Sequence, residues 1–342
     1  MMSSINTKIY ELTGPYQLVV KEGEIDLAGI KDREVAAETI YSALSPGTEV
    51  AAYTGMPPLR PMKVYPRVNG YCNLARVIAT GSKVTAVEKG DLILTFQSHR
   101  STFVCPEAEI LVKIPGDADL KKVTTAFLFH LGYNALLEGG CIPGMNVAVV
   151  GAGTLGITTA VMANTFGLRT FVFSNQKNIG KIFSSYKLIQ VLPKDEPVKK
   201  SLDALTQAAG IDVVISTSNS WHDWEYALDM VRKRGTIITL GFPGRGEAPP
   251  VINPLDSKYL YDKQLCIKAC GLAVTIDAAP EDIRFTIKRN MQYLCHLIMS
   301  GVIDPAIIIS EEVNWDKLED VYKKIAARLP GYYTAILKWK YE

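Results

Sequence analysis

The chain lacks the features that direct a protein to nucleic acid, to a lipid surface or into the secretory pathway. Its 342 residues carry 37 Lys and Arg against 35 Asp and Glu, a net charge of +2, without a block of like charge. No electrostatic feature therefore favours nucleic acid or an anionic membrane. The first residues, MMSSINTKIYELTG, have neither the basic nor the apolar region of a secretory signal. The most apolar stretch, Val147 to Ala163, contains three glycines and three threonines, which favours strand, turn and helix over a membrane span.

Cysteine is sparse, and its spacing is not that of a disulfide framework. The six residues are Cys72, Cys105, Cys141, Cys266, Cys270 and Cys295. In a chain of this size the pattern predicts reduced thiols in a cytoplasmic protein. Cys266 and Cys270 lie in LCIKACG, which reads as a strand, so they are expected to share one face rather than to form a ligand pair on a helix.

The most informative feature present is a glycine motif at residues 146–156, NVAVVGAGTLG. An apolar run ends at Gly151, and Gly153 and Gly156 complete the spacing G-x-G-x-x-G around Thr154 and Leu155, ahead of an apolar helical stretch. Gly151 permits the tight turn, Gly153 lets the backbone approach a pyrophosphate, and Gly156 lets helix and strand pack closely. The motif predicts a dinucleotide-binding Rossmann unit, and the alternative is an ordinary strand–helix turn.

The chain is long enough for two domains. Short β-type runs fill about the first 120 residues, and strand–helix alternation then predicts an α/β fold with a doubly wound parallel sheet. We expect a β-rich catalytic domain at residues 1–127 and 273–342, and a nucleotide-binding domain at residues 128–272. Helices are expected at 178–187, 199–210, 222–235 and 281–301.

The type of dinucleotide depends on the residues after the second strand. In NAD-binding units an Asp or Glu at this place binds the ribose 2′-OH. Here TFVF is followed by Ser174, Asn175, Gln176 and Lys177, with no carboxylate. Hydrogen-bonding side chains and a cation suit a 2′-phosphate, so NADP is predicted to be preferred. In the alternative, Lys177 is a solvated residue at a helix start and NAD is accepted through Ser174 and Asn175.

Over nearly its full length the chain resembles the medium-chain dehydrogenase/reductase superfamily. The resemblance is carried by the β-rich start, VIATGSKVTAVEKGDLI, GAGTLG, DVVIST, TIITLGF and the C-terminal return. Residues 45–71, SPGTEVAAYTGMPPLRPMKVYPRVNGY, are also similar to the bacteriochlorophyllide dehydrogenase branch. The resemblance implies a GroES-like β-rich domain and an NAD(P)-dependent oxidoreductase acting on a small molecule. It also implies cofactor contacts at Thr217, Gly241 and Phe242, and a homodimer paired through LCIKACG.

Many members of this superfamily hold zinc, and here the resemblance places unsuitable residues at the ligand positions. The catalytic ligands fall on Pro46, Tyr71, Cys72 and Phe127, of which proline and phenylalanine cannot bind a metal. The structural zinc loop falls between Asp91 and Pro106, where Cys105 is the single cysteine. A zinc-independent enzyme is therefore predicted.

Without zinc, a side chain must supply the proton or hydrogen bond when a carbonyl gains hydride. Thr48 lies where the superfamily often has a proton-relaying hydroxyl, Tyr71 replaces a zinc ligand, and His130 lies one helical turn beyond Phe127. Each has a structural alternative: a turn residue, a barrel residue and a core histidine. A pKa of His130 suited to proton transfer near neutral pH is expected.

Glu49 and Tyr53 are weaker candidates, and Glu49 is expected at most to brace its loop. His99, His222 and His296 show no partner in the sequence, and Arg245 is expected to contact either solvent or an acidic substrate.

Three functions remain open on the sequence alone. The first is interconversion of a secondary alcohol and a ketone with NADP. The second is NADPH-dependent reduction of a quinone or an enone. The third is nucleotide binding without catalysis, which the unsuitable residues at the metal positions permit.

Overall fold

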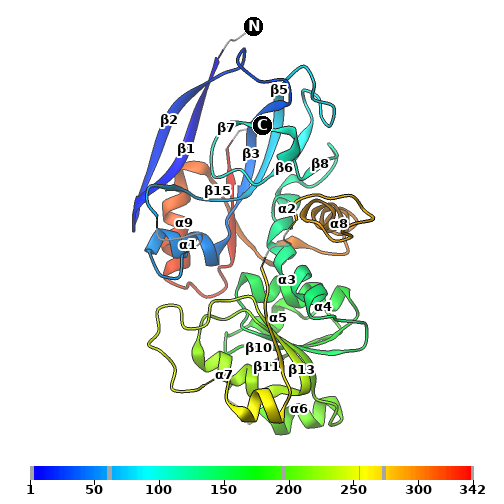
Figure 1. Cartoon of the computed structure of the whole chain (residues 1–342). Helices are drawn as coiled ribbons and strands as arrows, with labels where there is room; N and C mark the ends of the chain where they lie inside the picture. The colour runs from blue at the N-terminus through cyan, green and yellow to red at the C-terminus, as the bar shows by residue number, and fades with distance from the viewer. Residues whose placement is uncertain (1–3, 60–63, 195–197, 254, 272–274, 340–342) are drawn as a thin grey trace. The chain divides into compact units, whose positions relative to one another are not determined.

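The computed structural model describes residues 4–59, 64–194, 198–253, 255–271 and 275–339 (Figure 1). Residues 60–63 of the segment resembling the bacteriochlorophyllide branch, and the expected boundary at 272–273, lie outside the described residues. The chain divides into two compact units, residues 1–127 with 274–342 and residues 128–273. In the described part of the chain, no helix combines the length and the apolar character needed to cross a membrane.

The first unit contains two sheets. One has the order β2-β1-β4, and the other has the order β15-β16-β3-β5-β6-β8, with β7 also paired to β3. Its strands are β1 (Ser4–Gly14), β2 (Gln17–Asp26), β3 (Glu34–Ala43), β4 (Arg67–Val68), β5 (Cys72–Thr80), β6 (Leu92–Thr95), β7 (Thr102–Pro106), β8 (Val112–Ile114), β15 (Ile309–Asn314) and β16 (Thr334–Lys338). Its helices are α1 (Pro46–Thr54), α2 (Leu120–Thr124), α8 (Ile287–Met299) and α9 (Leu318–Ala326), with short helical turns at Glu107–Glu109, Pro305–Ile307 and Trp315–Lys317.

The C-terminal segment completes the larger sheet of the first unit. Strand β16 pairs with β3 between residues 336–338 and 41–43, so the central strand of this sheet joins segments almost 300 residues apart. Helices α1 and α9 pack through a shared core that includes Tyr53, Tyr322 and Trp339. The start of α1 is therefore positioned by the C-terminal part of the chain.

The second unit contains a parallel sheet with helices between its strands. The strand order is β11-β10-β9-β12-β13-β14, and the pairings are parallel. Its elements are α3 (Ala126–Glu138, starting at the unit boundary), β9 (Asn146–Val150), α4 (Thr154–Thr165), β10 (Arg169–Phe173), α5 (Ile179–Ile182), β11 (Ile189–Leu192), α6 (Val198–Thr206), β12 (Ile211–Ser216), α7 (Trp221–Met230), β13 (Val231–Thr239), a helical turn at Lys258–Asp262, and β14 (Cys266–Ala269). The order reverses between β9 and β12, which is where doubly wound sheets bind their ligands. The predicted α/β fold is confirmed.

Several helices are shorter than predicted. Helix α7 ends at Met230 instead of residue 235, because residues from Val231 onward join β13 through a register shift against β12. Helix α5 is a single turn, and α6 ends at Thr206, four residues before Gly210. Helix α8 begins at Ile287 because the side chain of Thr286 accepts a hydrogen bond from the Arg289 N–H and caps it there.

Candidate functional site

The glycine motif forms a turn that other residues would not fit. Gly151 has a φ of +102°, and a Cβ there would lie 2.9 Å from the Thr217 hydroxyl oxygen. A Cβ on Gly156 would lie 2.0 Å from the Gly151 carbonyl oxygen, so α4 packs directly against the turn. The Thr217 hydroxyl donates to the Val150 carbonyl oxygen at 3.0 Å, so its position at the end of β12 helps to hold this turn.

Gly153 differs from its two neighbours in the motif because open space surrounds it. A Cβ on Gly153 would meet no heavy atom within 4 Å. Gly153 is also the N-cap of α4 and has no side chain with which to cap the helix. The first turn of a helix presents N–H groups and a positive dipole end, which together bind anions. This cradle fits a dinucleotide pyrophosphate lying against Gly153, Thr154 and Leu155.

The residues expected at the ribose lie together after β10. Ser174 is buried and its hydroxyl accepts the Gln176 N–H at 3.2 Å. The exposed Asn175 accepts the Lys194 N–H at 2.7 Å through its Oδ1, and Lys177 is exposed. A carboxylate that sequence reasoning missed also lies nearby, since Lys194 Nζ contacts both carboxylate oxygens of Asp223 at 2.9 and 2.8 Å.

Gly241 and Phe242 follow β13 at the same edge of the sheet. The Gly241 N–H donates to the Ser216 carbonyl oxygen at 3.0 Å, and a Cβ there would lie 2.2 Å from the Ser218 carbonyl oxygen. The Arg245 guanidinium stacks on the Phe242 ring at 4.4 Å, and burial lowers its pKa. Arg245 is half-buried and packs against the Phe242 ring, and its contact with solvent or an acidic substrate stays a prediction.

In the first unit, the structure brings Tyr71 and Thr48 together and adds Ser45. The Tyr71 hydroxyl contacts the Ser45 hydroxyl, and Thr48, exposed in the first turn of α1, also forms a hydrogen bond with the phenol. Burial raises the pKa of Tyr71, and the nearby Cys72 and Glu49 raise it further. The phenol is therefore protonated at neutral pH and can act as a hydrogen-bond donor.

The positions that correspond to zinc ligands are occupied by a largely aromatic cluster. The Phe127 ring lies edge-on to Tyr71 at 5.4 Å, and the Phe96 ring lies 4.8 Å from Phe127. Burial raises the pKa of Cys72 well above its usual value, so its thiol stays protonated. Among the residues that the structure describes, no group of three or more His, Cys, Asp or Glu side chains could hold a metal ion. Of the residues at these positions, Pro46 and Phe127 carry no side-chain atom that can bind a metal.

His130 lies in the second unit, on α3, and is fully buried. Burial lowers its pKa to about 4. The expectation that it titrates near neutral pH is wrong, because removing the imidazole from water penalises its charged form. At neutral pH His130 is a neutral side chain.

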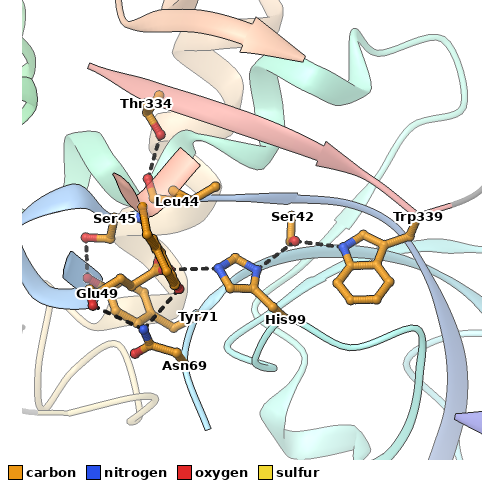
Figure 2. A network of polar contacts seen from close by, with 10 residues as sticks. Ser42, Leu44, Ser45, Glu49, Asn69, Tyr71, His99, Thr334 and Trp339 are labelled. Atoms are coloured by element: carbon orange, nitrogen blue, oxygen red, sulfur yellow. Dashed lines mark hydrogen bonds and ion pairs between the residues drawn. The ribbon is translucent and has the colours of Figure 1, made fainter. Parts of the chain in front are cut away.

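A buried polar network lies beside the hydroxyl group of Tyr71 and was largely missed by sequence reasoning (Figure 2). At its centre the Glu49 carboxylate accepts the Ser45 N–H at 2.7 Å and the Tyr322 hydroxyl at 2.8 Å, and contacts His99 Nε2 at 2.8 Å. His99, for which the sequence indicated no partner, also contacts the Ser42 hydroxyl at 2.8 Å through Nδ1. Tyr53 is separate from this network, since its hydroxyl donates to Glu319 at 3.1 Å.

One signal in the sequence pointed to Glu49. Ser45 and Glu49 flank the start of a helix in an arrangement close to that of a capping box, in which an acidic side chain reaches back to the N-cap N–H. No such local signal exists for His99 or Tyr322, whose contacts with Glu49 span 50 and 273 residues.

The fold is shared with solved dehydrogenases over nearly the whole chain. The 2R,3R-butanediol dehydrogenase of Bacillus subtilis has a TM-score of 0.80 at 13% identity, covering 97% of this chain and 99% of that one. The L-idonate 5-dehydrogenase of Escherichia coli has a TM-score of 0.80 at 15% identity, covering 98% and 99%.

Sequence comparison also matches this chain to dehydrogenases. The family described as "Zinc-binding dehydrogenase" matches residues 154–287. Alcohol dehydrogenase 1 of Neurospora crassa is 31% identical over 217 residues, which are 52% of this chain and 60% of that protein. The L-threonine 3-dehydrogenase of Bacillus velezensis is 23% identical over 332 residues, 86% of this chain and 89% of that protein. The chain spans 55% of the Bacillus subtilis sorbitol dehydrogenase. Together these findings support the resemblance of this chain to the medium-chain dehydrogenase/reductase superfamily.

Proposed function

We propose that this chain is an NAD(P)-dependent oxidoreductase that interconverts a secondary alcohol and a ketone by hydride transfer. The observation that carries the proposal is the glycine turn at the switch point of the sheet, with open space at Gly153 and the uncapped start of α4 beside it. The names of the relatives, which include alcohol, sorbitol and threonine dehydrogenases, support the alcohol–ketone reaction.

The hydroxyl groups of Tyr71, Ser45 and Thr48 suit the proton-transfer step of this reaction. When hydride from a dihydronicotinamide adds to a carbonyl carbon, the C=O π electrons move to oxygen, which then takes a proton. Tyr71, kept protonated by burial, donates that proton, and the Ser45 hydroxyl and the exposed Thr48 hydroxyl relay a replacement proton from solvent to the phenol. In the oxidative direction the same hydroxyls pass the alcohol proton to solvent. His130 enters the proposal as a neutral imidazole.

We propose further that the enzyme works without zinc and prefers NADP. The first point rests on Pro46, Tyr71, Cys72 and Phe127, which do not form a metal donor set. The second rests on Ser174, Asn175 and Lys177, which suit a 2′-phosphate better than a bare ribose. The Lys194–Asp223 pair beside Asn175 supplies both a cation and a carboxylate to the same edge, so the preference needs a direct measurement.

The remaining features of the proposal concern substrate, assembly and location. The resemblance of residues 45–71 to the bacteriochlorophyllide dehydrogenase branch favours a bulky, ring-bearing hydroxyethyl-type alcohol. A homodimer is proposed through β14, the exposed edge strand of the parallel sheet. We propose a cytoplasmic location because the thiols of the chain are unpaired with one another.

The testing experiment is a titration of the purified protein with NADPH and with NADH, followed by nicotinamide fluorescence. Tighter NADPH binding, followed by turnover of ketones, is the expected result. Tighter NADH binding overturns the cofactor preference alone. Turnover of quinones or enones without ketones favours the reductase alternative, and binding without any turnover favours a non-catalytic nucleotide-binding protein. If neither cofactor binds, the proposed function fails.

A further inference from the structure

We infer that Glu49 and His99 are positioning residues that hold both partners of the Ser45–Tyr71 hydroxyl pair. This inference rests on the proposed function, in which that pair handles the proton. Glu49 and His99 have exposures of 0% and do not face solvent, so they are not proposed to touch the substrate. Their part is to fix where the Tyr71 hydroxyl points.

Glu49 fixes the Ser45 side of the pair. A buried carboxylate is costly unless donors surround it, and here three donors come from Ser45, His99 and Tyr322. Because Glu49 accepts the Ser45 backbone N–H, it holds the residue at the N-cap of α1. The Ser45 hydroxyl, which at an N-cap position usually caps the helix, does not do so here and contacts the Tyr71 hydroxyl instead.

His99 fixes the Tyr71 side of the pair. Gly70 has a φ of +93°, and a Cβ there would lie 2.6 Å from the His99 ring, so the backbone directly before Tyr71 lies against the imidazole. The His99 backbone N–H also donates to the Asn69 carbonyl oxygen at 2.9 Å. The Asn69 amide in turn donates to the Glu49 carbonyl oxygen at 3.2 Å. The segment 69–71 is therefore held by His99 and by the backbone carbonyl group of Glu49.

For a neutral His99 imidazole, the inventory of donors and acceptors gives one arrangement for the rest of the network. The Trp339 indole N–H can only donate, and it contacts the Ser42 hydroxyl at 2.9 Å. Ser42 accepts there and donates its own proton to His99 Nδ1, which leaves Nε2–H to donate to Glu49. Figure 2 shows this line of contacts from Trp339 to Glu49. The orientation of the imidazole is thus set from both sides.

The test compares Glu49→Gln and His99→Gln with Thr39→Val as the matched control. Thr39 is also buried in this unit and accepts a hydrogen bond from the Asn73 amide at 2.8 Å, but it has no contact with Ser45 or Tyr71 in the network described. We expect kcat to fall about tenfold to a hundredfold in both network variants, because small misplacements of a catalytic group cost rates of this order. The KM for the cofactor should stay within about twofold. Thr39→Val should leave kcat unchanged.

A double-mutant cycle separates positioning from general loss of structure. If Glu49 acts through Tyr71, adding Glu49→Gln to Tyr71→Phe should lower kcat little further. Additive losses, or equal losses in Thr39→Val, would overturn the inference.

A second readout does not depend on turnover or on the proposed function. With 3-fluorotyrosine incorporated at position 71, the ¹⁹F chemical shift should move in Glu49→Gln and His99→Gln and stay in place in Thr39→Val. An unmoved signal in the network variants overturns the inference even if the wild type is an active enzyme. A moved signal in a protein without any turnover leaves the positioning intact and rejects the proposed function. Should either glutamine variant fail to fold, Gly70→Ala, which displaces the His99 ring, takes its place with the same two outcomes.

Discussion

The two units of this chain position their candidate functional groups by different means. In residues 128–273 the backbone positions these groups. Three glycines within six residues shape the turn, and neighbouring parallel strands bring Ser174, Thr217 and Gly241 to one edge of the sheet. In the first unit buried side chains do it, since Glu49 joins α1 to segments at residues 69, 99 and 322.

The difference has a physical consequence. A backbone cradle recognises features common to all dinucleotides and tolerates few substitutions at its glycines. In a network of buried side chains, individual residues can be replaced by residues of different chemistry while the surrounding backbone keeps its conformation. The resemblance to the medium-chain dehydrogenase/reductase superfamily places Tyr71 and Phe127 where metal ligands often stand, while the fold is shared with solved dehydrogenases. The reaction chemistry is therefore expected to vary more than the cofactor site.

The largest change in activity is expected for a variant of the first unit that loses turnover but still binds the cofactor. Tyr71→Phe should lower kcat for ketone reduction by about 10²- to 10⁴-fold, the usual contribution of a proton donor, with unchanged NADPH affinity. Steady-state kinetics and a cofactor titration measure the two quantities. The control is Tyr53→Phe, which removes another buried hydroxyl near α1 but one that bonds Glu319. Equal effects of the two variants would show that Tyr71 has no special role.

A buried side chain in the second unit, His130, provides the second test. The unfolded chain protonates His130 near pH 6.5, whereas the folded chain resists protonation until about pH 4. Its contribution to stability is therefore complete above pH 6.5 and declines as the pH falls toward 4, by roughly 3 kcal/mol at about 1.4 kcal/mol per pKa unit. Denaturation of the wild type and of His130→Gln between pH 4 and 7 checks this. The variant should lose less stability in acid, and matching curves would refute the assignment.

Gly153 tests whether the backbone cradle holds the cofactor. Gly153→Ala and Gly180→Ala both add a methyl group where no atom lies within 4 Å. Thermal stability should therefore be unchanged or slightly raised in both. Only Gly153→Ala should weaken NADPH binding, by about tenfold, since the methyl group would occupy space proposed for the pyrophosphate. Equal affinity in both variants would place the cofactor elsewhere.

The smallest expected effect concerns the 2′-phosphate. Lys177 is exposed, so its contact with a phosphate is worth about 1 kcal/mol, or roughly fivefold in affinity. Lys177→Ala should weaken NADPH binding by this factor and leave NADH binding unchanged. Lys181→Ala, an exposed lysine on α5, serves as the control. A parallel loss for both cofactors in Lys177→Ala would argue against recognition of the 2′-phosphate by this residue.

The fold and the glycine turn could be predicted because their signals are local. The spacing of Gly151, Gly153 and Gly156 and the alternation of strands and helices both lie within short windows of sequence. Helix ends were predicted less well. The end of α7 depends on pairing between β12 and β13, which overrides the helical pattern of residues 231–235.

The network around Glu49 could not be predicted in full because its contacts are not local. Ser45 is the N-cap residue of α1, yet its hydroxyl contacts Tyr71, 26 residues away. His99 lies in a loop with no periodic pattern, and its two ring contacts reach back 50 and 57 residues. Burial then decides the chemistry, as the pKa of about 4 at His130 shows, and burial of a single side chain is not visible in sequence.

We propose that side-chain hydroxyls take the place of a metal in this chain, and removal of metal from the protein tests this proposal. The protein is stripped with a chelator, its residual metal content is determined, and ketone reduction is assayed with NADPH before and after addition of zinc. We predict equal turnover in the stripped and zinc-supplemented protein, and loss of that turnover in Tyr71→Phe under both conditions. Turnover that disappears on stripping and returns with stoichiometric zinc would contradict the account.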